Sequence, residues 1–222
     1  MVGIEKVEEV SIEARHYQVL PDQRVVCVLC PKACVLHEEE AGRCRIRRVK
    51  EGRLIAESYG QVSSLALDPI EKKPLFHFYP GALILSVGTV GCNLACGFCQ
   101  NWEIAHGDAE TRYLAPEELV AMAMRYRRKG NIGLAYTYSE PLVWYEYIID
   151  TATLAHKEGL KNILVTNGYI NPEPLQELLP LIDAVNLDLK GWTDEFYRKN
   201  CEGRVKPVLE TAKILADQVS LE

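Results

Sequence analysis

The sequence has neither a long apolar run nor an excess of basic residues. No apolar stretch in its 222 residues approaches the roughly 20 residues that a membrane-spanning helix requires. The first ten residues are acidic and lack the apolar core of a secretory signal. The formal net charge of −6 argues against general binding to nucleic-acid phosphates, which requires a basic surface. These absences predict a cytoplasmic protein that is not embedded in a membrane and has no nucleic-acid partner.

What the sequence does contain is cysteine, with eight residues of which seven fall in two short groups. In a cytoplasmic protein, clustered cysteines more often bind metal than pair as disulfides. The second group, Cys92, Cys96 and Cys99, has the spacing C-x3-C-x2-C and follows the apolar run 82–90. Its cysteines should therefore lie on a loop at the carboxyl end of a strand, where α/β folds place active groups. The remaining Cys201 is expected to be a small buried side chain.

Three thiolates this close in sequence can bind three irons of a [4Fe–4S] cluster. Such a cluster normally takes four cysteines, so one iron would keep an open coordination position. A zinc site is an alternative, although zinc usually takes four ligands and would need a further one such as His106. A structural disulfide pair is another alternative. Gly88, Gly91 and Gly97 are expected to allow loop conformations that side chains would block.

The first cysteine group lies in the charge-rich first 60 residues and has the spacing C-x2-C-x3-C-x9-C. Four cysteines complete a zinc site or an auxiliary iron–sulfur cluster equally well, and His37 could replace one of them. The alternating runs 45–49 and 53–57 are separated by Glu51-Gly52 and predict a hairpin. We therefore expect residues 1–60 to form a small metal-binding module. Its candidate ligands are Cys27, Cys30, Cys34 and Cys44.

Predicted strands alternate with predicted helices from residue 82 onward. The strands are 83–90, 131–137, 161–166 and 182–189, and the helices are 116–129, 141–157, one from 171, one from 193 and 207–216. This alternation predicts an α/β fold with a parallel sheet over residues 82–222. The proline-rich residues 61–81 are expected to be a connector. A fifth strand begins near residue 219, where the sequence stops, so we expect a C-terminally incomplete α/β unit.

Polar residues stand where three of these strands end. The strand ends read Tyr-Thr-Tyr-Ser-Glu-Pro at 136–141, Val-Thr-Asn-Gly at 165–168 and Asn-Leu-Asp-Leu-Lys-Gly at 186–191. The period of two in a strand places Asn186, Asp188 and Lys190 on one side, where buried polar groups need partners or a ligand. The structural alternatives are an Asp188–Lys190 pair and a Glu140 that only supports a helix N-terminus.

The C-x3-C-x2-C spacing, with Phe98 just before the last cysteine, resembles the signature of the radical S-adenosylmethionine (SAM) enzymes. In that superfamily the open iron chelates SAM, and an electron from the cluster cleaves SAM to a 5′-deoxyadenosyl radical that abstracts hydrogen. The resemblance implies a [4Fe–4S] cluster on the second cysteine group, a partial (β/α) barrel and a reductant such as flavodoxin or ferredoxin. It also implies that strand ends contact SAM. The residues expected to do so are Phe98, Ser139, Glu140, Asn167, Asp188 and Lys190.

Four segments together resemble the radical SAM member of the AmmeMemoRadiSam system, which is similar to the pyruvate formate-lyase activating enzyme. These segments are 27–34, 68–78, 91–102 and 136–141. The resemblance implies Memo-like and AMMECR-type partner proteins but gives no substrate. The sequence departs from the activating enzymes in its cysteine-rich module and in Tyr138-Ser139, which replace a Gly-Gly pair. We therefore expect a radical SAM enzyme of unknown substrate, with a glycyl-radical enzyme activase and a non-catalytic metal-binding scaffold as alternatives.

Overall fold

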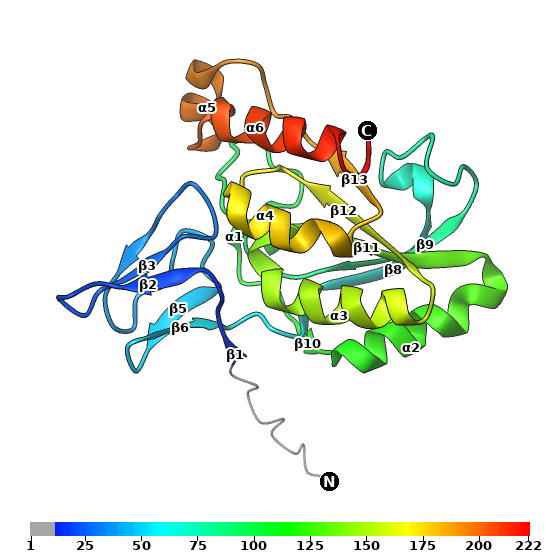
Figure 1. Ribbon diagram of the computed structural model, residues 1–222, viewed down its shortest axis with the longest axis horizontal. Coiled ribbons are helices and arrows are strands. Elements are labelled where there is room, and N and C mark those ends of the chain that lie inside the picture. Colours follow the sequence, from blue (N-terminus) through cyan, green and yellow to red (C-terminus); the bar gives the residue numbers. More distant parts are fainter. Residues whose placement is uncertain (1–11) are drawn as a thin grey trace, which may run out of the picture.

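The computed structural model describes residues 12–222 and shows a small β-rich part beside a larger α/β part (Figure 1). The acidic residues that argued against a secretory signal fall within residues 1–11, which lie outside the described residues. Within the described chain, no helix combines the length and apolarity needed to cross a membrane.

The larger part is built on a six-stranded sheet with the order β14-β13-β12-β11-β9-β8. Neighbours from β9 to β14 pair in parallel, whereas β8 pairs antiparallel with β9 at one edge. The strands are β8 (Ser64–Pro69), β9 (Leu83–Gly88), β11 (Asn131–Tyr136), β12 (Lys161–Thr166), β13 (Ala184–Leu187) and β14 (Ser220–Leu221). The sheet is open, so the architecture is the expected α/β partial barrel and not a closed one.

Helices α2, α3, α4 and α6 lie along one face of this sheet (Figure 1). The helices are α1 (Trp102–His106), α2 (Pro116–Tyr126), α3 (Tyr145–Lys157), α4 (Pro172–Leu178), α5 (Asp194–Cys201) and α6 (Val205–Ala216). Short 3-10 turns are η1 (Ile70–Lys72), η2 (Arg127–Lys129), η3 (Pro141–Trp144) and η4 (Leu179–Leu181). The central strands are apolar along most of their length because strands of a parallel sheet are covered on both faces.

The predicted strands and helices are confirmed in their order, with two corrections. The strand expected over 182–189 ends at Leu187, and the helix expected over 141–157 begins as the 3-10 turn η3. Another correction, beyond those two, concerns the expected connector 61–81, which contains β8 and the short β7 (Gln61–Val62) that pairs with β10 (Arg112–Tyr113). Sheet structure therefore starts before residue 82, because the proline-rich segment still supplies an edge strand that ends at Pro69. The division into domains at 60 and 82 stays a prediction.

The N-terminal part contains two three-stranded sheets, β1-β6-β5 and β2-β3-β4. Their strands are β1 (Ile12–Glu13), β2 (Tyr17–Val19), β3 (Val25–Cys27), β4 (Val35–Leu36), β5 (Arg47–Lys50) and β6 (Arg53–Ala56). The predicted hairpin is confirmed as β5 and β6, which pair antiparallel. Glu51 and Gly52 at its turn both have positive φ angles, of 52° and 72°, as a two-residue hairpin turn of this type requires.

A buried ion pair joins the N-terminal part to α3. The Arg47 guanidinium donates to both carboxylate oxygens of Glu146, at 2.9 and 2.8 Å, and the two side chains are 1% and 5% exposed. The backbone of Arg15 completes the network by donating to Glu146 and accepting from Arg47. A buried charge is tolerated only when it is paired and hydrogen-bonded, so this network fixes β5 against α3.

Candidate functional site

The carboxyl ends of the parallel strands surround a cavity of about 550 Å³. Parallel strands bring their carboxyl ends to the same edge of a sheet, which is where ligands bind in open α/β folds. Every residue predicted to hold the second cluster or SAM lines this cavity. These residues are Cys92, Cys96, Phe98, Cys99, Ser139, Glu140, Asn167, Asp188 and Lys190. The structure thus brings the predicted set together, while the roles of its members stay predictions.

Cys92 begins the cluster loop, which we define as residues 92–99. Its sulfur accepts the backbone N–H of Leu94 at 3.4 Å and the side-chain amide of Asn167 at 3.7 Å. Burial raises the pKa of Cys92 and raises that of Cys96 to about 12. Deprotonated cysteines at these buried positions require a positive charge nearby, which a bound metal group supplies.

The donor set fits a cluster better than a single ion. Among residues 12–222, no group of three or more His, Cys, Asp or Glu side chains is arranged to hold a metal ion. A lone zinc ion requires its sulfur ligands at about 2.3 Å from one point. The irons of a [4Fe–4S] cluster each take their own ligand, so three cysteines that line one cavity suit such a cluster. His106, the alternative zinc ligand, lines the same cavity.

At two of the three glycines Gly88, Gly91 and Gly97, a side chain would clash with a backbone carbonyl. Gly91 has a φ of +91°, and a Cβ there would lie 2.6 Å from the carbonyl oxygen of Cys44. A Cβ on Gly88 would lie 2.7 Å from the carbonyl oxygen of Thr137. The expectation for Gly97 is wrong, because a Cβ there meets nothing within 4 Å. Glycine is therefore required at residue 88, where β9 ends, and at residue 91, where the Cys44 backbone of the N-terminal part comes close.

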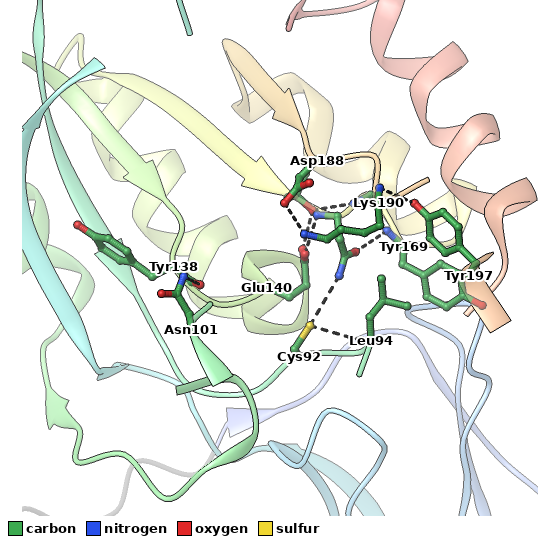
Figure 2. Close-up of polar contacts among 12 residues, drawn as sticks. Cys92, Leu94, Asn101, Tyr138, Glu140, Tyr169, Asp188, Lys190 and Tyr197 are labelled. Atoms are coloured by element: carbon green, nitrogen blue, oxygen red, sulfur yellow. Dashed lines mark hydrogen bonds and ion pairs between the residues drawn. The ribbon is translucent and has the colours of Figure 1, made fainter. Parts of the chain in front are cut away.

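Glu140 connects the ends of β11 and β12 (Figure 2). Its carboxylate accepts hydrogen bonds from the Leu142 N–H at 2.9 Å, the Thr166 hydroxyl at 2.6 Å and the Asn167 N–H at 2.8 Å. Burial raises its pKa, and these three donors oppose that rise. The bond from Leu142 caps η3, so the structural alternative for Glu140 is present. Glu140 also lines the cavity.

Asn167 links the end of β12 to the cluster loop. Its amide nitrogen donates to the Asn93 side-chain oxygen at 3.0 Å as well as to Cys92, and its own oxygen accepts the Tyr169 N–H at 2.8 Å. Asn93 in turn donates to the Tyr169 carbonyl at 2.7 Å. The sequence did not single out Asn93, because a loop residue carries no periodic signal. Its amide nevertheless fixes Cys92 relative to the strand end.

The segment after β13 differs from the prediction. Asp188 and Lys190 line the cavity and form an ion pair, which was the structural alternative for them. Burial lowers the pKa of Lys190, but the Asp188 carboxylate outweighs it and raises that pKa overall. Asn186 does not share their side and donates instead to the Pro74 carbonyl at 3.1 Å. The strand ends at Leu187, so strand alternation does not extend to Asp188.

Tyr138 occupies the position of the first glycine of the Gly-Gly pair and has a φ of +73°. A non-glycine residue in this region carries strain of about 1–3 kcal/mol, which surrounding contacts must offset. Its hydroxyl donates to Asp68 at 3.0 Å, and the Lys73 ammonium lies 4.7 Å from its ring centre. Asn101 donates to its carbonyl at 2.8 Å. In Figure 2, Tyr138 and Asn101 lie apart from the group around Glu140.

Asp68, at the end of β8, binds two lysines that the sequence placed in a connector. Lys73 is buried and lies 3.0 Å from the carboxylate, and the exposed Lys72 lies 3.1 Å from it. Burial alone would raise the pKa of Asp68, but the hydrogen bonds from both lysines lower it to about 2. Both lysines line the cavity. The expected connector therefore adds charge to a site that the sequence predicted to consist of the cluster loop and the strand ends.

Ser139 provides an unused polar group. Its hydroxyl oxygen is buried and finds no hydrogen-bond partner within residues 12–222. The residue lines the cavity. Buried polar atoms are nearly always satisfied, so an unpaired hydroxyl at a cavity wall fits a polar ligand.

The first cysteine group lies together in the N-terminal part, away from this cavity. The Cys34 sulfur accepts the backbone N–H of Arg43 at 3.4 Å, and neighbouring cysteines contribute to the raised pKa values of Cys27, Cys30 and Cys44 after the larger effect of burial. His37, the possible substitute ligand, is exposed. Four cysteines are the ligand number of a zinc site or an iron–sulfur cluster, although the absence of a group arranged to hold a single metal ion among residues 12–222 applies to this group as well.

The family model of the radical SAM superfamily matches residues 86–220. The uncharacterized protein MJ0808 of Methanocaldococcus jannaschii is 46% identical over 205 residues, covering 91% of this chain and 60% of the relative. The pyruvate formate-lyase 1-activating enzyme of Escherichia coli is 32% identical over 136 residues, covering 58% of this chain and 54% of the relative. This chain thus spans between half and two thirds of the length of these relatives.

Two solved structures are similar to parts of this chain at low TM-scores. Streptococcus suis SuiB bound to S-adenosylmethionine has a TM-score of 0.45 and 17% identity, covering 58% of this chain and 30% of that one. QueE from Escherichia coli has a TM-score of 0.41 and 12% identity, covering 71% and 76%. The match of the family model over more than half of the sequence decides the assignment: the chain belongs to the radical SAM superfamily and is homologous to the pyruvate formate-lyase activating enzyme.

Proposed function

We propose that this chain is the cofactor-binding part of a radical SAM enzyme in which Cys92, Cys96 and Cys99 hold a [4Fe–4S] cluster. The observation that carries the proposal is the single cavity on which these cysteines and the polar strand ends converge. When bound, the reduced cluster supplies the electron that cleaves SAM to a 5′-deoxyadenosyl radical, which abstracts hydrogen from an unknown substrate. Membership of the superfamily supports this assignment.

The cavity walls offer matched charges for the amino-acid end of SAM. Lys190 supplies positive charge for the SAM carboxylate, and Glu140 can accept a hydrogen bond from the SAM ammonium. Charge-assisted hydrogen bonds of this kind are about twice as strong as neutral ones. The unpaired hydroxyl of Ser139 and the amide of Asn167 add polar contacts, and Phe98 and Asp188 complete the wall. These residues orient the cofactor next to the cysteine loop.

The direct test is anaerobic reconstitution of the full chain with iron and sulfide, followed by incubation with SAM and dithionite. We expect release of 5′-deoxyadenosine, measured by chromatography and mass spectrometry. A Ser139→Ala variant should bind SAM more weakly while keeping its iron, because the cysteine ligands are untouched. Iron-loaded protein that releases no 5′-deoxyadenosine would contradict the proposal and favour a non-catalytic metal-binding scaffold.

Glycyl-radical activation is the second candidate, and homology to the Escherichia coli activating enzyme favours it. Tyr138-Ser139 in place of a Gly-Gly pair separates this chain from those enzymes. The two candidates differ in their product, because an activase leaves a stable glycyl radical on its partner protein. Addition of pyruvate formate-lyase to the SAM-cleaving mixture, followed by electron paramagnetic resonance, tests this. A glycyl-radical signal that requires this chain would establish the activase.

We propose that Cys27, Cys30, Cys34 and Cys44 hold a second metal group, either a zinc ion or an auxiliary iron–sulfur cluster. The proximity of the four cysteines and the amide donor to Cys34 support this. Iron and zinc content of full-length Cys34→Ala, compared with the unmodified protein, distinguishes the two. Loss of zinc alone identifies zinc, loss of iron identifies a cluster, and unchanged metal content contradicts the proposal.

We propose a flavodoxin or a ferredoxin as reductant, and Memo-like and AMMECR-type proteins as partners, in a cytoplasmic setting. These proposals rest on the sequence resemblance alone. Replacement of dithionite by reduced flavodoxin in the SAM-cleavage assay tests the reductant, and co-purification of the tagged chain with Memo-like and AMMECR-type proteins tests the partners.

A further inference from the structure

Two neighbouring lysines, Lys72 and Lys73, line a part of the cavity that the proposed function leaves unused. The ammonium of Lys73 lies 4.7 Å from the ring centre of Tyr138. Figure 2 shows Tyr138 apart from the group around Glu140, where we place the amino-acid end of SAM. The lysine pair therefore marks a second end of the cavity.

The lysine pair carries more positive charge than its surroundings neutralise. Both ammonium groups form ion pairs with one carboxylate, that of Asp68. Within residues 12–222, neither lysine forms an ion pair with another carboxylate. Glu71 precedes them in the sequence, but its carboxylate accepts the Gly81 N–H at 2.6 Å. Two ammonium groups and one carboxylate thus leave one positive charge at the cavity wall.

Hydrogen bonds fix the position of the lysine pair. The Lys73 N–H donates to the Ile70 carbonyl at 2.8 Å and closes η1, and the Ile70 N–H donates to the Ala82 carbonyl at 3.0 Å, next to β9. The Tyr138 hydroxyl donates to the Asp68 carboxylate at 3.0 Å. Groups that are already held in position lose less conformational entropy when a ligand binds.

The two lysines differ in exposure. Lys73 is 3% exposed, and burial lowers its pKa although the Asp68 carboxylate opposes the drop. The side chain of Lys72 is 67% exposed. Negative charge nearby stabilises a buried ammonium, and an exposed ammonium on its flexible stem can turn toward a ligand oxygen. An anion in the cavity would therefore stabilise the buried lysine and accept hydrogen bonds from the exposed one.

We propose that the lysine pair binds an anionic group of the substrate, either a carboxylate or a phosphate. This inference rests on the proposed function, in which SAM occupies the other end of the cavity. Lys72 donates charge-assisted hydrogen bonds to the anion, and Lys73 supplies positive charge from the wall beside Tyr138. The substrate is therefore an acid or a phosphorylated compound rather than a neutral or a cationic one.

The test measures anion binding to the full-length, cluster-loaded protein with SAM present and without a reductant, so that SAM is not cleaved. Inorganic phosphate and isotope-labelled succinate are the probes, and their nuclear magnetic resonance line widths at constant ionic strength give the Kd. We expect at least one probe to bind saturably. Lys72→Gln should raise its Kd about tenfold, because the variant loses a charge-assisted hydrogen bond.

The matched control is Lys129→Gln. Lys129 is also exposed and also lies near an aromatic ring, that of Tyr126, but neither residue lines the cavity. This variant should leave the Kd unchanged. Binding of phosphate alone would identify a phosphorylated substrate, and binding of succinate alone would identify a carboxylic acid.

Four outcomes would overturn the inference: no saturable binding of either probe, an unchanged Kd in Lys72→Gln, an equal rise in Lys129→Gln, or displacement of the probe by SAM. Displacement would assign the lysines to the SAM site. The same titration without SAM separates this inference from the proposed function. A protein that takes up no cluster refutes the proposed function, whereas the Kd of Lys72→Gln without SAM still decides whether the lysine pair binds an anion.

Discussion

The two cysteine groups of this protein differ in ligand number and in access. The first has four cysteines, of which Cys27 and Cys44 are buried, and lies outside the main cavity. The second has three cysteines that line a cavity with polar strand ends. A complete ligand set is typical of structural metal sites, and an incomplete one leaves a position for chemistry. Under the proposed function, we expect the first group to support the fold and the second to hold the reactive cluster.

The segments that carry the two groups are nevertheless in contact. Gly91 abuts the carbonyl of Cys44, and the Arg43 side chain forms an ion pair with Glu202, just beyond α5. The ion pair is exposed and contributes at most about 1 kcal/mol. The close approach of the Cys44 backbone to Gly91 is the stronger constraint, because it leaves no room for a side chain at residue 91.

The largest expected contrast is between cysteine variants of the two groups. Cys96→Ala should abolish both the cluster signal and SAM cleavage, because it removes one of three ligands. Cys34→Ala should leave SAM cleavage measurable, since its sulfur does not line the cavity. Iron content, electron paramagnetic resonance and 5′-deoxyadenosine release measure both. Complete loss of SAM cleavage in a folded Cys34→Ala protein would show that the two groups act together.

The second contrast concerns the ion pair between the two parts. Glu146→Ala leaves Arg47 buried without its partner, so we expect a loss of about 3–5 kcal/mol in the free energy of unfolding. Urea denaturation followed by circular dichroism measures it. The matched control is Lys206→Ala, which breaks the exposed Lys206–Glu210 pair on α6 and should cost no more than about 0.5 kcal/mol. Equal losses in both variants would mean that the Arg47 network does not hold the parts together.

The smallest contrast is a pH dependence at the edge of the cavity. The pKa of Asp68 is about 2 in the folded state against 3.8 as its ordinary value, so its stabilising contribution is present above pH 3.8 and is lost as pH falls toward 2. Between pH 5 and pH 3 this loss is about 1 kcal/mol. Urea denaturation at both pH values should show it in the unmodified protein but not in Asp68→Asn.

An exposed carboxylate provides the control for this pH effect. Asp217→Asn should retain the full loss between pH 5 and pH 3, because Asp217 is exposed and Asp68 is unchanged. The assignment to Asp68 would fail if Asp68→Asn lost as much stability as the unmodified protein over the same interval.

The sequence predicted the elements and the site residues that depend on local pattern. Alternating apolar runs located the strands, and parallel pairing then placed residues such as Glu140 and Asn167 at one edge. Contacts between distant segments could not be predicted this way. The Asp68–Tyr138 hydrogen bond and the bond from the Ala95 N–H to the Cys201 carbonyl depend on how β8 and α5 fold back onto the sheet. The left-handed backbone conformation of Tyr138 could not be predicted from the sequence either, because tyrosine rarely adopts it.

The tight junction at Gly91 has a practical consequence for protein engineering. A shortened version that keeps only the sheet and its helices would remove the Cys44 backbone that covers the start of the cluster loop. It would also expose Glu146 and the apolar surface around it, which the N-terminal strands now shield. A shortened version designed to keep the cavity intact should therefore retain residues 12–60.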